Sequence, residues 1–505
     1  MSGFGGLIRA EWVKLRSVNR WLITLFGAAV LTIGLSLLGA NGSNTDVNEK
    51  PNFVVGPHGE PVADGFSYVH QPVTGDVTLT VKVSSLAPQD EPAERTNPGG
   101  GSTMTRLDDP SPWNAASAGI MIKDGATSGA SYAAVFVNSA HGVRLQSDFR
   151  TDIAGKSTTA PQWLRLTRTG NVVSAYQSAD GTSWEKVGEV TPAHLPATAE
   201  VGFYVSSSPT LYVSRGAGGS SVGAHLTRAV ATFDDIALTG ATTGDWQTGA
   251  VRQPGDEGRE IKAGAPETTG FSESGGVYTV TGAGRIGPQD VGDDPVEASL
   301  LGVIAGIMAL IAVGVLYATS EYRRGMIRTT FAAEPRRGRV LAAKALVLGG
   351  TAFVLSLVGV VAGYLIARPA LRKNGFAPPA FPDESITDPV VLRVLLLSAA
   401  FMALLAVFAM AVGVLLRHSA GAITLTIVLV ILPMIVGSIL PGTLPRLLMY
   451  TTLAGGMATQ RSKPPTQTLA EPWALIGPWA GIGVVAAYTA VALGLAWWAL
   501  RRRDV

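Results

Sequence analysis

Six stretches of this 505-residue chain are long, apolar and free of charged side chains. A helix of about 20 apolar residues spans the hydrocarbon core of a bilayer, which is about 30 Å thick. A buried helix of a soluble protein seldom needs so long a run, so six runs predict an integral membrane protein with six transmembrane helices. The stretches are Trp21–Ala40, Ser299–Thr319, Ala345–Ala367, Val394–Leu416, Ser419–Leu440 and Trp479–Leu500.

The segments that connect these stretches predict the orientation of the helices, because Lys and Arg are enriched in short cytoplasmic loops. With the N-terminus inside, the inner segments are 1–20, 320–344, 417–418 and 501–505, which together carry 15 basic and 4 acidic residues. Residues 41–298 carry 17 basic and 29 acidic residues. The sequence therefore predicts cytoplasmic N- and C-termini and an extracytoplasmic segment 41–298.

Residues 4–18 predict an amphipathic helix at the inner membrane surface. Leu7, Ile8 and Leu15 fall on one face of such a helix, and Arg9 and Arg16 fall on the opposite face. The alternative is a cleaved signal peptide, since residues 38–40 resemble a cleavage site. The following apolar run is longer than the about 7–15 residues of a signal-peptide core, which favours a retained helix.

Residues 41–298 differ in character, because their apolar residues form short alternating runs. Val77–Val83 alternates apolar and polar side chains, as a half-buried strand does. Turns rich in Gly, Asp and Pro separate the runs and predict an antiparallel β-sandwich with a core at about 62–240, whereas 87–112 and 241–270 predict loops. The chain has no cysteine, so no disulfide stabilises this domain. Further predicted strands are Ala118–Lys123, Tyr132–Asn138, Leu164–Arg168, Val172–Gln177, Val201–Val205 and Ala231–Leu238.

The strings at 118–123, 163–168 and 231–236, with the Asp180-Gly181 hairpin, resemble the concanavalin-A-like lectin and glucanase jelly rolls. Glucanases of this fold align carboxylates on one strand face for acid–base catalysis. Residues 62–240 contain no such array, so we do not expect an enzyme. Trp184 follows the hairpin and either stacks on a glycan or covers the turn; the second interpretation is favoured.

Two nucleotide-binding motifs are incomplete. Gly155-Lys156-Ser157 resembles the end of a phosphate-binding loop, but Arg150 stands where the first glycine is required. The Gly-x-Gly-x-x-Gly match at 282–287 is followed by Pro288 instead of a helix. The six histidines show no metal-binding spacing. We therefore expect no cofactor and no metal in this chain.

The predicted spans also contain no ionisable residue at depth, whereas ion-coupled transporters normally need one and channels usually need polar rings. Any energy for transport is therefore expected from a separate ATPase on the cytoplasmic side. Residues 321–344 resemble the coupling segment of type-2 ATP-binding-cassette (ABC) export permeases, especially actinobacterial ones, and 9–15 resemble the start of the same family.

This resemblance covers about 1–40 and 299–505. It implies a permease in a bacterial plasma membrane that pairs with a second permease copy and with ATP-binding subunits, which hold the ATP and Mg²⁺. The basic segment 320–344 would fit a groove on the ATPase or meet lipid phosphates; a simple positive-inside loop is the alternative. Glu11 and Lys14 would pair with each other or meet this segment. The expected partner-coupling residues are Glu11, Lys14, Glu321, Arg323, Arg324, Gly325, Arg328, Pro335, Arg337 and Lys344.

The expected architecture is thus an all-α membrane part with an inserted all-β sandwich, divided into 1–40, 41–298 and 299–505. The main alternative function is a membrane-anchored surface protein that binds a cell-wall glycan, but one anchoring helix would suffice for that. An envelope glycoside hydrolase would need the absent carboxylates. The cargo stays open among lipids, peptides and hydrophobic drugs, and no nucleic-acid partner is expected.

Overall fold

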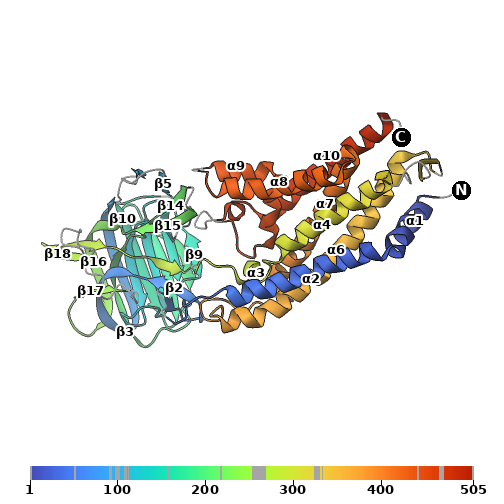
Figure 1. Cartoon of the computed structure of the whole chain (residues 1–505). Coiled ribbons are helices and arrows are strands. Elements are labelled where there is room, and N and C mark those ends of the chain that lie inside the picture. The colour runs from blue at the N-terminus through green and yellow to red at the C-terminus, as the bar shows by residue number, and fades with distance from the viewer. Residues whose placement is uncertain are drawn as a thin grey trace.

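A helical bundle and a β-sandwich lie end to end in the computed structural model, and both termini lie at the bundle end far from the sandwich (Figure 1). We call the two ends of the bundle the termini end and the sandwich end. The structure describes residues 3–49, 53–89, 94–96, 103–106, 111, 113–156, 158–216, 219–252, 269–289, 291–323, 330–332, 334–440, 443–465 and 471–502.

The six predicted spans are confirmed. Among the described residues, six helices are long and apolar enough to cross a membrane. An amphipathic helix, α1 (Phe4–Ser17), precedes them; Glu11 and Leu15 are buried, whereas Phe4 and Trp12 are exposed. Extended backbone at Val18 separates α1 from the first span. The spans lie in α2 (Asn19–Gly42), α4 (Val303–Arg323), α6 (Arg337–Lys373), α7 (Pro389–Leu416), α8 (Ser419–Gly437) and α10 (Pro478–Arg502).

Helix α7 is the centre of the bundle, because most of its side chains are buried and it packs against α4, α6, α8 and α10. Helix α2 packs against α4 and α6. Short elements occupy the sandwich end of the bundle. They are α3 (Pro295–Ala298), α9 (Leu444–Thr451) and the 3-10 helices η1 (Leu453–Gln460) and η2 (Pro472–Leu475).

Glycines allow α4 and α6 to approach α2 closely. A Cβ atom at Gly302 would lie 1.8 Å from the carbonyl oxygen of Thr32, and one at Gly306 would lie 2.2 Å from the Thr32 hydroxyl. On α6, Cβ atoms at Gly359 and Gly363 would lie 3.3 and 3.2 Å from atoms of α2. These two Gly-x-x-x-Gly pairs both pack against the same helix, as small residues do in membrane bundles.

We expect Gly302→Ala to destabilise the protein by about 1–3 kcal/mol, because an added methyl group would meet a backbone carbonyl that cannot rotate away. Thermal unfolding of the purified full-length chain in detergent would measure the effect. Gly350→Ala is the matched control, since no atom lies within 4 Å of its added Cβ. Alanine is the better helix former, so this control should be neutral or stabilising. Equal loss in both variants would contradict close packing at Gly302.

The predicted antiparallel β-sandwich is also confirmed. Its 13-stranded sheet follows the path β12-β11-β10-β3-β13-β6-β7-β8-β9, with β16, β17, β18 and β19 off this path. The long strand β3 pairs with β10, β13, β16 and β17. The strands are β3 (Phe66–Gln89), β6 (Ser117–Lys123), β7 (Tyr132–Asn138), β8 (Gly142–Ser147), β9 (Thr151–Ala154), β10 (Gln162–Thr169), β11 (Val172–Ser178), β12 (Glu185–Val190), β13 (Thr198–Ser206), β16 (Arg228–Thr242), β17 (Gln247–Val251), β18 (Gly270–Ser274) and β19 (Val277–Gly282).

Buried and partly exposed side chains alternate along the strands, and the buried ones form the core of the sandwich. In β3, Val77, Leu79, Val81 and Val83 are buried in one cluster with inward side chains of the neighbouring strands, whereas the residues between them are partly exposed. The sheet continues beyond the predicted core into β17, β18 and β19, and β17 lies within 241–270, which was expected to be a loop.

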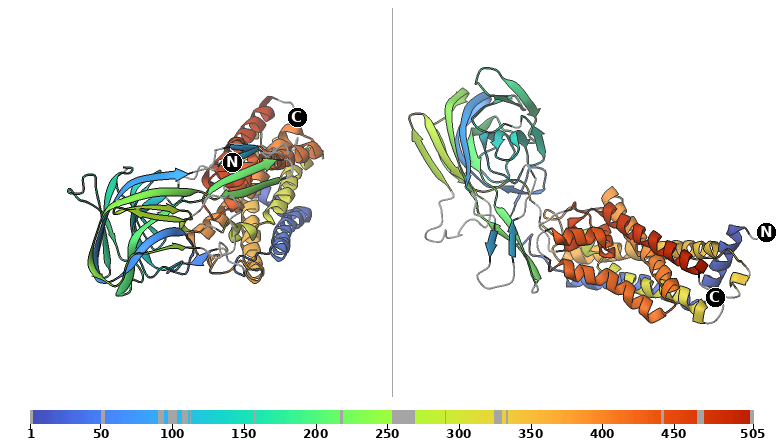
Figure 2. Two further views of the ribbon diagram at one scale, coloured as in Figure 1. Left: turned by 90° about the vertical axis from the view of Figure 1, so that its left-hand side faces the viewer. Right: turned by 90° about the horizontal axis from the view of Figure 1, so that it is seen from above.

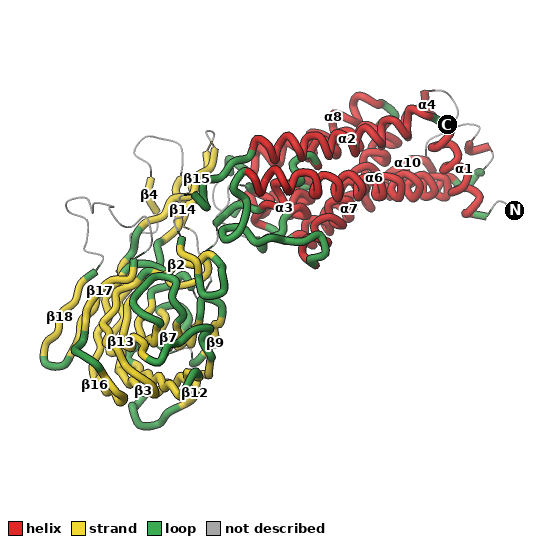
Figure 3. The backbone as a smooth tube through the Cα atoms, turned by 90° about the horizontal axis from the view of Figure 1, so that it is seen from below, coloured by secondary structure: helices red, strands yellow, loops and turns green. Residues whose placement is uncertain are grey.

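Two smaller sheets lie on the side of the sandwich that faces the bundle, where Figure 3 labels β2, β4, β14 and β15, and the hairpin of the larger one reaches toward the bundle (Figure 2). A four-stranded sheet contains β4 (Glu94–Thr96), β5 (Thr103–Arg106), β14 (Thr210–Gly216) and β15 (Gly219–His225), so part of the expected loop 87–112 is strand. The other sheet, here called the linker sheet, contains β1 (Val54–Val55), β2 (Pro61–Asp64) and β20 (Ile286–Pro288). Because β2 pairs with β20, the first and last parts of the inserted domain are hydrogen-bonded to each other.

Candidate coupling site

A buried cluster of charges joins α1, α4 and α6 at the termini end of the bundle. The Lys344 ammonium lies 2.9 Å from Glu11 Oε2 and 2.5 Å from Glu321 Oε1. Lys14 contacts the same oxygen of Glu321 and lies 3.9 Å from Glu11. The Tyr317 hydroxyl donates a hydrogen bond of 2.8 Å to Glu11 Oε2. We call these five residues the coupling cluster.

The coupling cluster is neutral in total, because two carboxylates face two ammonium groups. Glu321 is 2% exposed, Lys344 4% and Glu11 6%, so these charges are largely removed from water. The removal of one partner from such a network leaves a buried charge without compensation and costs about 3–5 kcal/mol. Aromatic rings complete the surroundings: Lys344 Nζ lies 5.1 Å from the Tyr317 ring centre, and Trp21 packs edge-on against the same ring.

Four of the ten predicted coupling residues therefore come together, although two of them lie more than 300 positions before the other two in the sequence: Glu11, Lys14, Glu321 and Lys344. The sequence left open whether Glu11 and Lys14 pair only with each other. In the structure both also contact side chains of the predicted segment 321–344. The sequence prediction did not include Tyr317, which hydrogen-bonds to Glu11. Tyr317 and Glu321 are four residues apart, a spacing that places both on one face of α4 and could have suggested Tyr317 as a neighbour of the predicted site.

The other predicted coupling residues lie around the connection between α4 and α6. Arg323 ends α4, and Pro335 precedes the first residue of α6, Arg337. The Arg337 guanidinium donates to the carbonyl of Leu500 at the end of α10. The remaining three fall within 324–329, outside the described residues: Arg324, Gly325 and Arg328.

A second polar cluster, here called the α3 clamp, lies at the sandwich end. Asp294 caps the N-terminus of α3 by accepting hydrogen bonds from the amides of Val296 and Glu297, and it also accepts from the amide and hydroxyl of Ser462. Glu297 contacts Arg461 at 3.3 Å and accepts a hydrogen bond of 2.6 Å from the Trp473 indole. The clamp thus joins the end of the inserted domain to the chain after η1.

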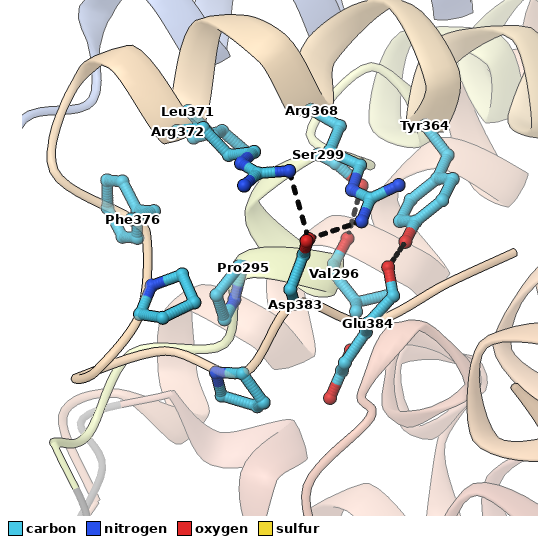
Figure 4. Close-up of a pocket in the computed structure, with 12 residues that line it drawn as sticks. Pro295, Val296, Ser299, Tyr364, Arg368, Leu371, Arg372, Phe376, Asp383 and Glu384 are labelled. Carbon is cyan, nitrogen blue, oxygen red and sulfur yellow. Dashed lines mark hydrogen bonds and ion pairs between the residues drawn. The ribbon is translucent and has the colours of Figure 1, made fainter. Parts of the chain in front are cut away.

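On its other side α3 borders a small pocket against α6 (Figure 4). Arg368 and Arg372 both contact the Asp383 carboxylate, and the Tyr364 hydroxyl donates a hydrogen bond of 2.9 Å to the Glu384 carbonyl. The pocket has a cavity volume of about 30 Å³, which leaves room for only a few water molecules. It is too small to accept a cargo molecule in this conformation.

In the sandwich, a buried ion pair joins the domain to the linker sheet. Lys123 of β6 and Asp64 of β2 are both fully buried, with Nζ 2.8 Å from Oδ2. Lys123 also donates to the Ala130 carbonyl, and Asp64 accepts from the Gly129 amide. Burial raises the pKa of Asp64, against the lowering effect of Lys123. This pair holds β2, and through it β20, against the sheet.

The predicted turn at Asp180-Gly181 is covered by a different tryptophan from the one expected. The ring of Trp163 lies 3.0 Å from a Cβ built on Gly181. Trp184 instead lies partly exposed under the guanidinium of Arg165, whose carbon is 3.8 Å from the ring centre. The sequence could not distinguish the two rings, because Trp163 reaches the turn from the neighbouring strand β10.

The family model described as "ABC-2 family transporter protein" matches residues 74–505. No curated protein matches the chain. Among solved structures, a functionally unknown protein from Saccharomyces cerevisiae is 16% identical, with 35% of this chain and 74% of that chain covered and a TM-score of 0.20.

Two peptidase structures are similarly distant. SCP-B of the eqolisin family is 11% identical, with a TM-score of 0.25, and scytalido-glutamic peptidase is 10% identical, with a TM-score of 0.26. Each alignment covers 43% of this chain and 98% of the peptidase. Superpositions of this quality support no conclusion about activity. The family match, in contrast, extends over most of the chain and includes five of the six candidate membrane helices. This multi-pass membrane protein therefore belongs to the ABC-2 family of transporter proteins.

Proposed function

We propose that this chain is the permease subunit of an ATP-driven exporter and that a separate subunit binds ATP and Mg²⁺ and hydrolyses the ATP. The termini end of the bundle would face the cytoplasm, as the excess of Lys and Arg in its segments favours. The sandwich would then be extracytoplasmic, in the plasma membrane of a bacterium. The resemblance of several strand sequences to concanavalin-A-like domains supports that type of sandwich.

The observation that carries this proposal is the position of the coupling cluster. Glu321 lies close to the end of α4, and Lys344 lies in the first turns of α6, so their ion pair joins the two helices on either side of the connection 324–336. A force applied to this connection by an ATPase would therefore move α4 and α6 together. Glu11 and Lys14 would transmit the movement to α1, and α1 to the first span.

The cargo pathway is proposed to lie between two permease copies. Within one copy α7 is packed on several sides by other helices, and its side chains are mostly buried. In the described part of the bundle, the pocket beside α3 has a volume of about 30 Å³, and a second pocket, lined by Glu321 of α4, Lys344 of α6 and Leu500 of α10, has a volume of about 20 Å³. A path for a larger molecule would thus open along helix faces that meet a second copy. Rocking of the two copies would open this path alternately.

Co-purification tests the proposal. Tagged chain isolated from its native host in mild detergent should carry ATPase activity, and Arg324→Glu should abolish it by reversing one charge in the expected contact. Arg446→Glu is the matched control, because Arg446 is exposed on α9 at the opposite end of the bundle. The control should retain full ATPase activity. Equal activity in wild type and Arg324→Glu, or none in wild type, would refute the proposed coupling.

A further inference from the structure

Helix α1 exposes basic, aromatic and aliphatic side chains together on one of its faces. Arg9, Trp12, Val13 and Arg16 are all exposed, Trp12 by 43% and Val13 by 55%. They stand at positions i, i+3, i+4 and i+7, so they form one continuous surface along the helix. We call this surface the outer face of α1. Its mixture of charge and apolar area suits a boundary between water and hydrocarbon.

The other face of α1 is occupied by the bundle. Leu15 and Glu11 are buried, and Leu7 and Ile8 are partly buried. Glu11 belongs to the coupling cluster, so this face is fixed to α4 and α6 by hydrogen bonds and ion pairs. The apolar face predicted from the sequence is therefore used within the chain, which leaves the outer face for contact with other molecules.

Tryptophans on α10 mark the level of the two membrane interfaces along the bundle. Trp479 is exposed near the start of α10, and Trp497 and Trp498 are exposed near its end. At 1.5 Å per residue, the 18 positions from Trp479 to Trp497 span about 27 Å, close to the about 30 Å of a hydrocarbon core. Exposed tryptophans are enriched at both interfaces of a bilayer. The end of α10 therefore lies at the membrane interface of the termini end.

Contacts with α6 place α1 close to the same level. The Trp497 indole nitrogen lies 2.6 Å from a Cβ atom built on Gly338, at the start of α6. Lys344, six positions further along α6, contacts Glu11 of α1. Six helical residues rise about 9 Å, and interfacial helices lie about 5–10 Å into the boundary between headgroups and acyl chains. Figure 1 shows α1 bent out of the line of α2 at this end of the bundle.

Electrostatics at the termini end favours an anionic partner. The carboxylates of Glu11 and Glu321 are buried in the coupling cluster, where lysines neutralise them. Arg501 and Arg502 at the end of α10 are exposed, and their guanidinium carbons lie 4.2 and 4.4 Å from the ring centres of the tryptophans four positions before them. Exposed arginines next to a membrane span attract anionic lipids.

We propose that the outer face of α1 binds the headgroups of anionic phospholipids in the surrounding leaflet. The guanidinium groups of Arg9 and Arg16 bind phosphate oxygens, and Trp12 and Val13 lie at the boundary with the acyl chains. Because Glu11 leaves the opposite side of the same helix turns, bound lipid holds α1 against the coupling cluster. Lipid binding at this face requires no ATPase subunit, so it does not rest on the proposed function.

Thermal unfolding of the purified full-length chain in a neutral detergent tests this surface. Phosphatidylglycerol should raise the unfolding midpoint in a saturable manner and more than phosphatidylcholine does. Arg9→Gln together with Arg16→Gln should weaken the apparent affinity for phosphatidylglycerol about tenfold. The matched control, Lys373→Gln together with Arg446→Gln, removes the same charge from exposed positions at the sandwich end and should leave the affinity unchanged. An unchanged affinity in the α1 variant, or equal weakening in both double variants, would overturn the proposal.

A probe on the outer face locates it relative to the bilayer. The chain has no cysteine, so Val13→Cys supplies a single labelling site. In vesicles of equal parts phosphatidylcholine and phosphatidylglycerol, a fluorophore there should be quenched by lipids that carry a spin label near the headgroup. Lys186→Cys, on the surface of the sandwich, is the control and should not be quenched. Quenching of the Val13→Cys label by a water-soluble quencher alone would overturn the proposal in favour of a face that meets a protein. Neither measurement contains an ATPase subunit, so a negative result leaves the coupling experiment unaffected.

Discussion

Lys344→Met should lower the free energy of unfolding by about 3–5 kcal/mol, because it leaves the carboxylates of Glu11 and Glu321 buried with only Lys14 to compensate them. The expected result is a marked fall in the thermal unfolding midpoint of the purified chain, with α1 released from α4 and α6. Lys373→Met is the matched control, since Lys373 is an exposed lysine near the other end of α6. It should not change the midpoint.

A double variant separates the charge network from simple packing. Glu11→Gln together with Lys344→Met removes one charge of each sign and leaves the Lys14–Glu321 pair in place. The double variant should therefore be more stable than Lys344→Met alone, because fewer buried charges lack a partner. If the loss of stability in the double variant equals the sum of the losses in Glu11→Gln alone and Lys344→Met alone, the four ionised side chains do not act as a unit.

Lys123→Met should produce a similarly large loss in the sandwich, about 3–5 kcal/mol, because Asp64 would stay fully buried without its cation. We expect β2 and β20 to detach from the sheet, and limited proteolysis should then cut between sandwich and bundle. Lys186→Met removes an exposed lysine of β12 that pairs only with Glu189 on the surface, so it is the control and should leave the digestion pattern unchanged.

The pH dependence of this variant gives a second criterion. The pKa of Asp64 is already raised by burial in the wild type, and the loss of Lys123 removes the effect that opposes it. A carboxyl whose pKa is raised in the folded state stabilises the fold at low pH, and this contribution is lost as the pH rises. Lys123→Met should therefore be less destabilised at pH 5 than at pH 8. An equal loss at both values would show that Asp64 is not the source of the defect.

Most of the architecture could be predicted because it depends on local patterns. A span of about 20 apolar residues can be recognised from its own sequence alone. The strand Val77–Val83 can be recognised in the same way, from the alternation of apolar and polar side chains. The strands β4, β5 and β17 were missed because Gly, Pro and acidic residues around them are typical of loops. Strand β5 pairs with β14 and β17 pairs with β3, both far away in the sequence, and β4 depends on β5 for its pairing, so no local pattern shows these strands.

The coupling cluster could be predicted only in part, for a related reason. The basic segment and the N-terminal motif identified Glu11, Lys14, Glu321 and Lys344, but as residues that contact a partner. Their burial depends on how α1, α4 and α6 pack, and the sequence does not contain that information. Arg461 was missed altogether, because a single arginine in the connection 441–473 is typical of an exposed loop.

The pairing of β2 with β20 has a consequence for how this chain can be re-engineered. Val47, before β1, and Val291, after β20, lie at the two ends of the inserted domain and pack against the same apolar cluster beside α6. A domain whose entry and exit adjoin can be excised or replaced without pulling its flanking helices apart. The sandwich is in this sense a detachable module, and a short hairpin grafted between residues 47 and 291 would give a compact permease of six helices.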